Sequence, residues 1–194
     1  MSRDVVKAQF EESLRVKRVF LDQYAEATAR AAEMLVTSLR AGGKILLFGN
    51  GGSAADAQHI AAELVGRFSR QRDGLPAIAL TTDTSALTAI ANDFGYEEIF
   101  ARQVRALGRA GDVAIAISTS GRSPSVLRAV EACKAIGMPT VGLAGGNGGL
   151  LAGAVDLPLV VTASTDAARI QETHITIGHV LCDLIDAAFA GSRP

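Results

Sequence analysis

The spacing of apolar residues divides the chain into a long helical segment and a part that alternates between two patterns. Over residues 4–40 apolar side chains recur every three or four positions, which predicts roughly forty residues of helix ended by Gly42 and Gly43. Beyond the glycines come short apolar runs without polar alternation, typical of strands covered on both faces. These runs are KILLFG (44–49), AIAL (77–80), VAIAIS (113–118), TVGLAG (140–145) and LPLVV (157–161).

Helix-like runs separate these five predicted strands. They cover residues 53–68, 85–107 with a break at NDFGYE, 123–136 and 166–190. Alternation of strands with helices implies right-handed crossovers and a parallel sheet. The sequence therefore predicts an α/β fold, a three-layer αβα sandwich of the flavodoxin or Rossmann kind with a five-stranded parallel sheet. We expect one domain over 1–194, with N-terminal helices over 1–42 for oligomerisation and the α/β core over 43–194.

Charge and composition narrow the function. The chain carries 19 basic and 20 acidic residues, so it offers no overall field for nucleic acid or an anionic membrane. It has no run of about 18 uncharged apolar residues, and we expect a cytoplasmic protein. Cys133 and Cys182 lie alone in apolar segments, which indicates reduced core thiols. An apolar fraction of 48% is high for a soluble monomer and predicts burial between subunits.

A glycine-rich loop, GNGGS, follows the first predicted strand. Gly49, Gly51 and Ala54 fit the dinucleotide pattern G-x-G-x-x-G/A, and Ser53 is placed to cap the next helix. Backbone N–H groups at such a loop bind phosphate or a polyhydroxylated ligand. The dinucleotide pattern also needs an acidic residue about 20 residues further on. Asp83 lies well beyond that distance, so the dinucleotide signal is weak.

A hydroxyl-rich loop, STSGRS, follows the third predicted strand. Four of its six residues carry hydroxyl groups, and a helix is expected to begin at Ser123 or Pro124. Hydroxyls at a helix N-terminus favour a bound phosphate. The loop has neither the lysine of G-x-x-x-x-G-K-[ST] nor the spacing of G-x-S-x-G, which disfavours a nucleotide loop and a hydrolase nucleophile.

The three histidines of the chain fall in two predicted helices. His59 and Glu63 are four residues apart and share a helix face, which Arg67 continues; such a pair chelates a metal or holds a base. His179 joins this candidate group from the last helix.

In that last helix, Gln171, His174 and His179 are expected along roughly one side, beside Gly178, where another chain can approach closely. His174 is interpreted as a structural residue.

These motifs resemble those of the sugar isomerase (SIS) superfamily, and more closely the phosphoheptose isomerases. The resemblance spans nearly the whole chain and rests on GNGGSAADAQHIAAEL, RF, AIANDFGYEEIF, GDVAIAISTSGRSPSVL and RIQETHITIGHVLCDLI, in order. It implies an enzyme that converts sedoheptulose 7-phosphate to D-glycero-D-manno-heptose 7-phosphate for lipopolysaccharide core or another glycan. It also implies a homotetramer whose sites draw on more than one subunit.

The resemblance assigns roles to individual residues. Glu63 and His179 match the catalytic pair, and one zinc or other divalent ion per subunit is implied at His59, Glu63, Gln171 and His179, with no nucleotide cofactor. Substrate contacts are implied at the following positions, to which we add Arg67: Asn50, Gly51, Gly52, Ser53, Glu63, Asn92, Asp93, Ser118, Thr119, Ser120, Ser123 and Gln171.

Two alternatives stay open on the sequence. A relative of the same fold binds the replication initiator DnaA without known catalysis, but it lacks the acid and base that Glu63 and His179 supply here. An NAD-dependent enzyme is the other alternative. The chain also has Ala168 where some family members carry an acidic residue. Which of Glu63 and His179 is the base depends on opposing effects of burial and nearby cations on the carboxyl pKa.

Overall fold

The computed structural model describes residues 2–191; Met1 and residues 192–194, which the predicted domain includes, lie outside this range. The predicted α/β fold is confirmed: five parallel strands form one sheet in the order β2-β1-β3-β4-β5. The strands are β1 (Ile45–Gly49), β2 (Ala77–Ala79), β3 (Val113–Ser118), β4 (Thr140–Gly145) and β5 (Leu157–Val161). The helices are α1 (Arg3–Arg40), α2 (Gly52–Val65), α3 (Thr84–Phe94), α4 (Ala101–Leu107), α5 (Pro124–Ala135), α6 (Leu151–Ala154) and α7 (Ala167–Phe189), with a 3₁₀ turn η1 (Tyr96–Glu98).

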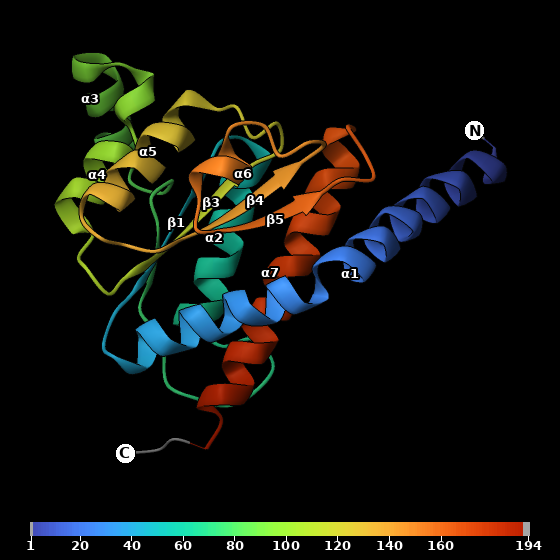
Figure 1. The fold of residues 1–194 in the computed structure, drawn as a ribbon, viewed down its shortest axis with the longest axis horizontal. Helices are drawn as coiled ribbons and strands as arrows, with labels where there is room; N and C mark the ends of the chain where they lie inside the picture. Colours follow the sequence, from blue (N-terminus) through green and yellow to red (C-terminus); the bar gives the residue numbers. More distant parts are fainter. Residues whose placement is uncertain (1, 192–194) are drawn as a thin grey trace.

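The sheet is the middle of three layers. Successive strand residues point to opposite faces, so Ile45 and Leu47 join one core while Leu46 and Phe48 join the other. Side chains of α1, α2 and α7 complete the first core, and those of α4 and α5 complete the second. Figure 1 shows these helices around the sheet. Because both faces are covered, every residue of β1, β3 and β4 is buried, which explains their unalternating apolar sequences.

The strand order places two loops side by side. The connection from β1 turns toward β2 at one edge, whereas β3 pairs on the other side of β1, so the topology reverses between β1 and β3. Gly49 pairs with Ile117 in register, so the GNGGS and STSGRS loops leave the sheet next to each other. Ligands of open α/β sheets bind at this kind of crevice.

Several boundaries differ from the sequence-based expectation. The N-terminal segment is one continuous helix, α1, rather than helices, and its first half extends away from the sheet (Figure 1). Helix α2 begins at Gly52 behind Gly51, which has a φ of 57°, so Ser53 lies inside the helix and the prediction that it caps the helix is wrong. The short elements η1 and α6 were not predicted because periodicity needs more than one turn to be visible.

Both cysteines are free and buried, as predicted. Within residues 2–191, the helices are all too short or too polar to span a membrane.

A carboxylate stabilises the amino ends of strands β1 and β3, at the end of the sheet opposite the GNGGS and STSGRS loops. Asp112 is 4% exposed and accepts hydrogen bonds from the backbone N–H of Lys44 and of Arg109, at 2.9 and 2.8 Å. The ammonium group of Lys44 donates a third, at 2.5 Å. Burial by itself raises the pKa of Asp112, but these hydrogen bonds outweigh it and hold the pKa below its usual value. The residues directly before β1 and β3, Lys44 and Asp112, are thereby joined.

We expect Asp112→Asn to lower the free energy of unfolding by about 1–3 kcal/mol at pH 7, because charged hydrogen bonds to a buried acceptor are lost. The folded pKa is depressed, so the stabilisation is complete above the unfolded-state pKa of about 3.9 and disappears as the pH falls through the folded value. Urea unfolding of both proteins between pH 7 and pH 3 measures the difference. The exposed Glu131→Gln serves as control, and a difference that does not shrink with acid would contradict this account.

Candidate active site

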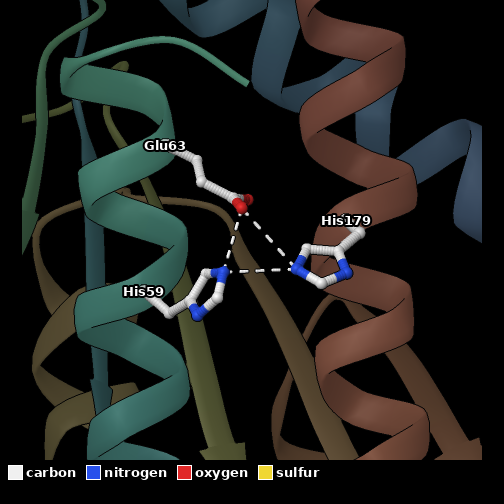
Figure 2. Close-up of side chains that lie close together, drawn as sticks. All are labelled: His59, Glu63 and His179. Atoms are coloured by element: carbon white, nitrogen blue, oxygen red, sulfur yellow. Dashed lines mark hydrogen bonds and ion pairs between the residues drawn. The ribbon is translucent and has the colours of Figure 1, made fainter. Parts of the chain in front are cut away.

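Three side chains from two helices converge on one side of the sheet. His59 and Glu63 lie one turn apart on α2, and His179 reaches them from α7 (Figure 2). The Nε2 atom of His59 lies 2.9 Å from Oε1 of Glu63 and 3.2 Å from Nε2 of His179. His179 Nε2 lies 3.6 Å from the same carboxylate oxygen. One chain therefore brings together a carboxylate and an imidazole that are more than a hundred residues apart in sequence.

A glycine lets the two helices approach this closely. A Cβ atom at Gly178 would lie 2.7 Å from Cδ1 of Ile60, closer than Cβ atoms normally approach, so the end of the Ile60 side chain would have to move. Ile60 belongs to α2 of the same chain, so the close approach expected at Gly178 is made within the chain. His179 follows Gly178 directly and is carried to within reach of Glu63.

The Glu63 carboxylate is poorly solvated and only partly paired. Its side chain is 16% exposed, and Oε2 is buried without a hydrogen-bond partner among the described residues. Burial raises the pKa of the neighbouring Cys182 thiol, and the Glu63 carboxylate raises it further, so Cys182 remains protonated. A buried, unsatisfied carboxylate oxygen is costly unless a cation or a proton donor meets it.

The donors at this position fit a divalent metal. One ligand atom from each of His59, Glu63 and His179 lies within 4.8 Å of the other two. Two imidazoles and a carboxylate are a donor set of catalytic zinc sites. The unpartnered oxygen of Glu63 adds an acceptor for a cation there.

Gln171 and His174, the other two predicted residues of α7, point in different directions. Gln171 packs against the first turn of α2, because a Cβ at Gly52 would lie 2.5 Å from its Nε2 atom. His174 instead faces the sheet, fully buried, with Nε2 3.1 Å from the carbonyl oxygen of Ala144. Burial lowers its pKa to about 4, so the ring is neutral. The expectation that all three share one side is wrong for His174, whose structural role the geometry supports.

A polar cavity of about 190 Å³ lies between the two loops. Asn50 spans it: Nδ2 donates to the hydroxyl of Ser123 at 2.9 Å and of Ser125 at 3.0 Å. Ser123 stands at the N-cap of α5 without a side-chain capping bond. The residues that line the cavity are Asn50, Ser53, Ile117, Ser118, Thr119, Ser120 and Ser123.

Tyr96 is a site residue that sequence reasoning missed. Its hydroxyl donates to Oδ1 of Asn50 at 2.9 Å, so a residue of η1 orients the amide that spans the cavity. Both residues also line a second cavity of about 210 Å³ between α2 and α3. The only signal in the sequence was that Tyr96 is an aromatic residue within the NDFGYE break.

Three residues that were predicted to contact substrate do not join the candidate site in this chain. Asn92 and Asp93 are exposed on α3, where Asn92 Nδ2 donates to Oδ1 of Asp93 at 2.8 Å. Arg67 lies beyond the end of α2 at Val65 and is exposed, so it does not continue the face of His59 and Glu63 as expected. Asp83 caps α3 by accepting the N–H of Ala86 at 2.9 Å, which leaves the dinucleotide interpretation without its ribose ligand.

Known proteins resemble this chain over nearly its whole length. A family model described as SIS domain matches residues 9–145. The phosphoheptose isomerase of Roseiflexus sp. (strain RS-1) is 58% identical over 92% of this chain and 90% of its own length. The solved structure of phosphoheptose isomerase GmhA from Neisseria gonorrhoeae is 49% identical with a TM-score of 0.90, covering 95% of this chain and 98% of that one. A phosphoheptose isomerase from Francisella tularensis is 42% identical with a TM-score of 0.92, over 96% and 99%.

The geometry predicts that the protein stripped with a chelator binds one Co²⁺ per chain at the His59, Glu63 and His179 group. His59→Ala and His179→Ala each remove one nitrogen donor and should weaken binding by at least about 10-fold, since ligand loss costs more than the 10–100-fold typical of outer-shell changes. Competition with a coloured chelator gives the affinity. Glu26→Gln, an exposed acid on α1, should bind Co²⁺ like the unchanged protein; equal affinity in all variants would rule out this site.

Proposed function

The chain belongs to the SIS domain family and, within it, to the phosphoheptose isomerases, and we propose that it isomerises sedoheptulose 7-phosphate to D-glycero-D-manno-heptose 7-phosphate. The observation that carries the proposal is the 3.6 Å approach of His179 to Glu63 in the same chain as the hydroxyl-lined cavity. The reaction needs these two features: a base and an acid at adjacent carbons, and an anchor for the phosphate.

The hydroxyl loop anchors the phosphate in this proposal. Ser118, Thr119, Ser120 and Ser123 line the cavity in front of the N-terminus of α5, and hydroxyl and N–H donors bind phosphate there without a cation. Asn50, held by Tyr96 and Ser123, and the backbone of Gly51 and Gly52 contact the sugar. With the phosphate held, the far end of the sugar extends toward α2 and α7.

Glu63 and His179 then move protons between C1 and C2. Glu63 takes the proton from C1 of the ketose, the electrons form the C1–C2 double bond of an enediol, and Glu63 returns the proton to C2. His179 donates a proton to O2 and accepts one from O1, so the aldose forms with no net change in protons. The carboxylate is partly buried, and its Oε2 atom has no hydrogen-bond partner among the described residues, so this oxygen is available to accept the proton from C1.

Zinc is the divalent ion we propose for the His59, Glu63 and His179 group, with Gln171 as the fourth donor and one ion per subunit. When bound there, it would supply a Lewis acid that polarises the sugar carbonyl. In this proposal His59 serves only as a ligand, whereas Glu63 and His179 would each use one atom as a ligand and keep the second carboxylate oxygen or ring nitrogen for proton exchange. The donor set and the unpartnered Glu63 oxygen support this assignment.

A homotetramer in the cytoplasm is the assembly we propose, with the N-terminal helix as its oligomerisation element in a single domain. Large apolar side chains are exposed along α1 and α7. An apolar groove of about 320 Å³ lies between these helices, and Leu21, Val180 and Leu184 line it. Arg67, Asn92 and Asp93, which do not reach the site of their own chain, contact substrate in a neighbouring subunit in this proposal.

The product serves heptose synthesis for lipopolysaccharide core or another glycan. The DnaA-binding alternative gains nothing from relatives that are phosphoheptose isomerases at 50–59% identity. Incubation with sedoheptulose 7-phosphate, with the product identified by NMR, tests the proposed reaction directly.

We expect Glu63→Gln and His179→Ala each to reduce kcat by about 10²–10⁴-fold, the usual contribution of general acid or base catalysis. KM should change little because the phosphate cavity is intact. Ser120→Ala is the complementary variant and should raise KM more than it lowers kcat. Circular dichroism verifies folding. Unchanged turnover in both Glu63→Gln and His179→Ala would remove them from the mechanism.

Leu184→Glu should split the tetramer, because it places a charge in the apolar groove between α1 and α7. Sedimentation velocity should show the unchanged protein as a tetramer and the variant as a smaller species. Leu150→Glu, at a more exposed leucine next to α6 that lies outside the groove, is the control and should stay tetrameric. A monomeric unchanged protein would contradict the proposed assembly.

A further inference from the structure

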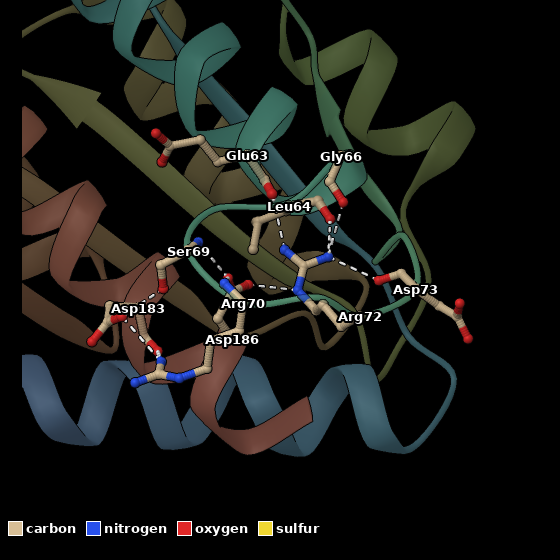
Figure 3. A network of polar contacts seen from close by, with 9 residues as sticks. All are labelled: Glu63, Leu64, Gly66, Ser69, Arg70, Arg72, Asp73, Asp183 and Asp186. Carbon is tan, nitrogen blue, oxygen red and sulfur yellow. Dashed lines mark hydrogen bonds and ion pairs between the residues drawn. The ribbon is translucent and has the colours of Figure 1, made fainter. Parts of the chain in front are cut away.

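The loop that follows α2 contains a buried arginine that takes no part in the proposed mechanism. We call residues 66–74, which follow α2 and lead back to the sheet, the α2 strap. Arg72 of the strap has a side chain only 1% exposed, and its partner Asp186 on α7 is fully buried (Figure 3). A buried ion pair contributes little net stability, because desolvation of both charges offsets their attraction. Its place in the fold therefore calls for another explanation.

Arg72 caps the C-terminus of α2, where Glu63 lies. Its Nη2 donates to the carbonyl oxygen of Glu63 at 2.9 Å, and its Nη1 donates to that of Leu64 at 2.9 Å. The same Nη1 also donates to the carbonyl of Asp73 at 2.8 Å. The carbonyls of Glu63 and Leu64 belong to the last turn of α2 and have no partner inside the helix, and a cation there also complements the helix dipole. The guanidinium group thus holds the backbone of Glu63 itself.

The other side of Arg72 is bound to the helix that carries His179. Its Nε donates to Oδ1 of Asp186 at 2.5 Å. Oδ2 of Asp186 accepts the backbone N–H of Ser69 at 2.8 Å and of Arg70 at 3.0 Å. Asp186 lies seven residues after His179, two turns along the same face of α7.

Asp186 stays charged in this position. Burial by itself raises its pKa, but the N–H groups of Arg70 and Ser69 and the Arg72 guanidinium outweigh that effect and hold the pKa below its usual value. A second pair, Arg70–Asp183, joins the strap to α7 as well, but its side chains are 43% and 47% exposed. Exposed pairs contribute little and do not constrain geometry.

We propose that Arg72, through Asp186, is a positioning residue that sets the axial register of α2 against α7 and so holds Glu63 and His179 at reacting distance. The proposal rests on the acid and base roles given above. The two helices must be held rigidly, because a misplacement of the reacting groups by about 1 Å can lower the rate about 10²-fold. The buried Arg72–Asp186 pair provides this rigidity, because the planar guanidinium binds both helices at once with fixed geometry.

Two conservative variants test the proposal. Arg72→Lys keeps the charge opposite Asp186 but cannot span the carbonyls of Glu63, Leu64 and Asp73. Asp186→Asn keeps an acceptor for the strap N–H groups but loses the ion pair. For both we expect kcat to fall about 10–100-fold with KM within about twofold, as for an effect on geometry at the reacting atoms. Arg70→Lys, in the exposed pair of the same strap and helix, is the matched control and should keep kcat.

A second readout needs neither substrate nor metal. The chain has three histidines, so the side-chain ¹⁵N–¹H NMR signals of the imidazoles can be assigned by substitution. In metal-free Arg72→Lys and Asp186→Asn, the signals of His59 and His179 should shift while that of His174 stays in place; Arg70→Lys should shift none of them.

The outcomes separate the inference from the proposed function. If the unchanged protein does not isomerise the sugar, the proposed function fails. The imidazole signals still show whether Arg72 and Asp186 set the register of α2 against α7. If the variants only lower the melting temperature, and keep kcat and the signals of His59 and His179 while folded, the positioning role is overturned. If one variant does not fold, the other decides.

Discussion

The contact between α2 and α7 is the constraint on which the candidate site depends. Gly178 leaves room for Ile60, so the two helices pack closely along a shared face. The helices are far apart in sequence, and neither alone carries both the carboxylate and the facing imidazole. Close packing of the helices brings the two side chains together, with Nε2 of His179 3.6 Å from Oε1 of Glu63. A larger side chain at the glycine would require Ile60 to shift.

The parallel sheet divides the chemistry between two places. The loops after β1 and β3 leave the sheet together because Gly49 and Ile117 are paired, and they form a neutral, hydroxyl-lined cavity suited to phosphate. The charged groups lie instead on the helices that cover one face. In the proposed function, phosphate anchoring and proton transfer therefore use different parts of the fold. The α2 strap adds a third, buried contact behind the site, where Arg72 joins both helices.

Prediction from sequence succeeded where a signal is local and failed where a partner is distant. The strands followed from apolar runs, and the pairing of His59 with Glu63 followed from helical spacing. The capping role of Ser53 was wrong because the preceding glycine begins the helix one residue earlier. Tyr96 was missed because its hydrogen bond to Asn50 crosses 46 positions of sequence. His174 was placed correctly as structural, although its direction toward β4 needed the structure.

Periodicity and glycine content act over a few residues, so the sequence was sufficient for the α/β class, the five strands, the two loops after β1 and β3 and the helix face of His59 and Glu63. The approach of His179 to that face within one chain, and the separation of Gln171 from His174, required the folded structure. It alone also revealed the burial of Arg72 against Asp186. The physical reason is that the approach of two helices depends on how side chains interlock across a core, which no spacing along one helix specifies.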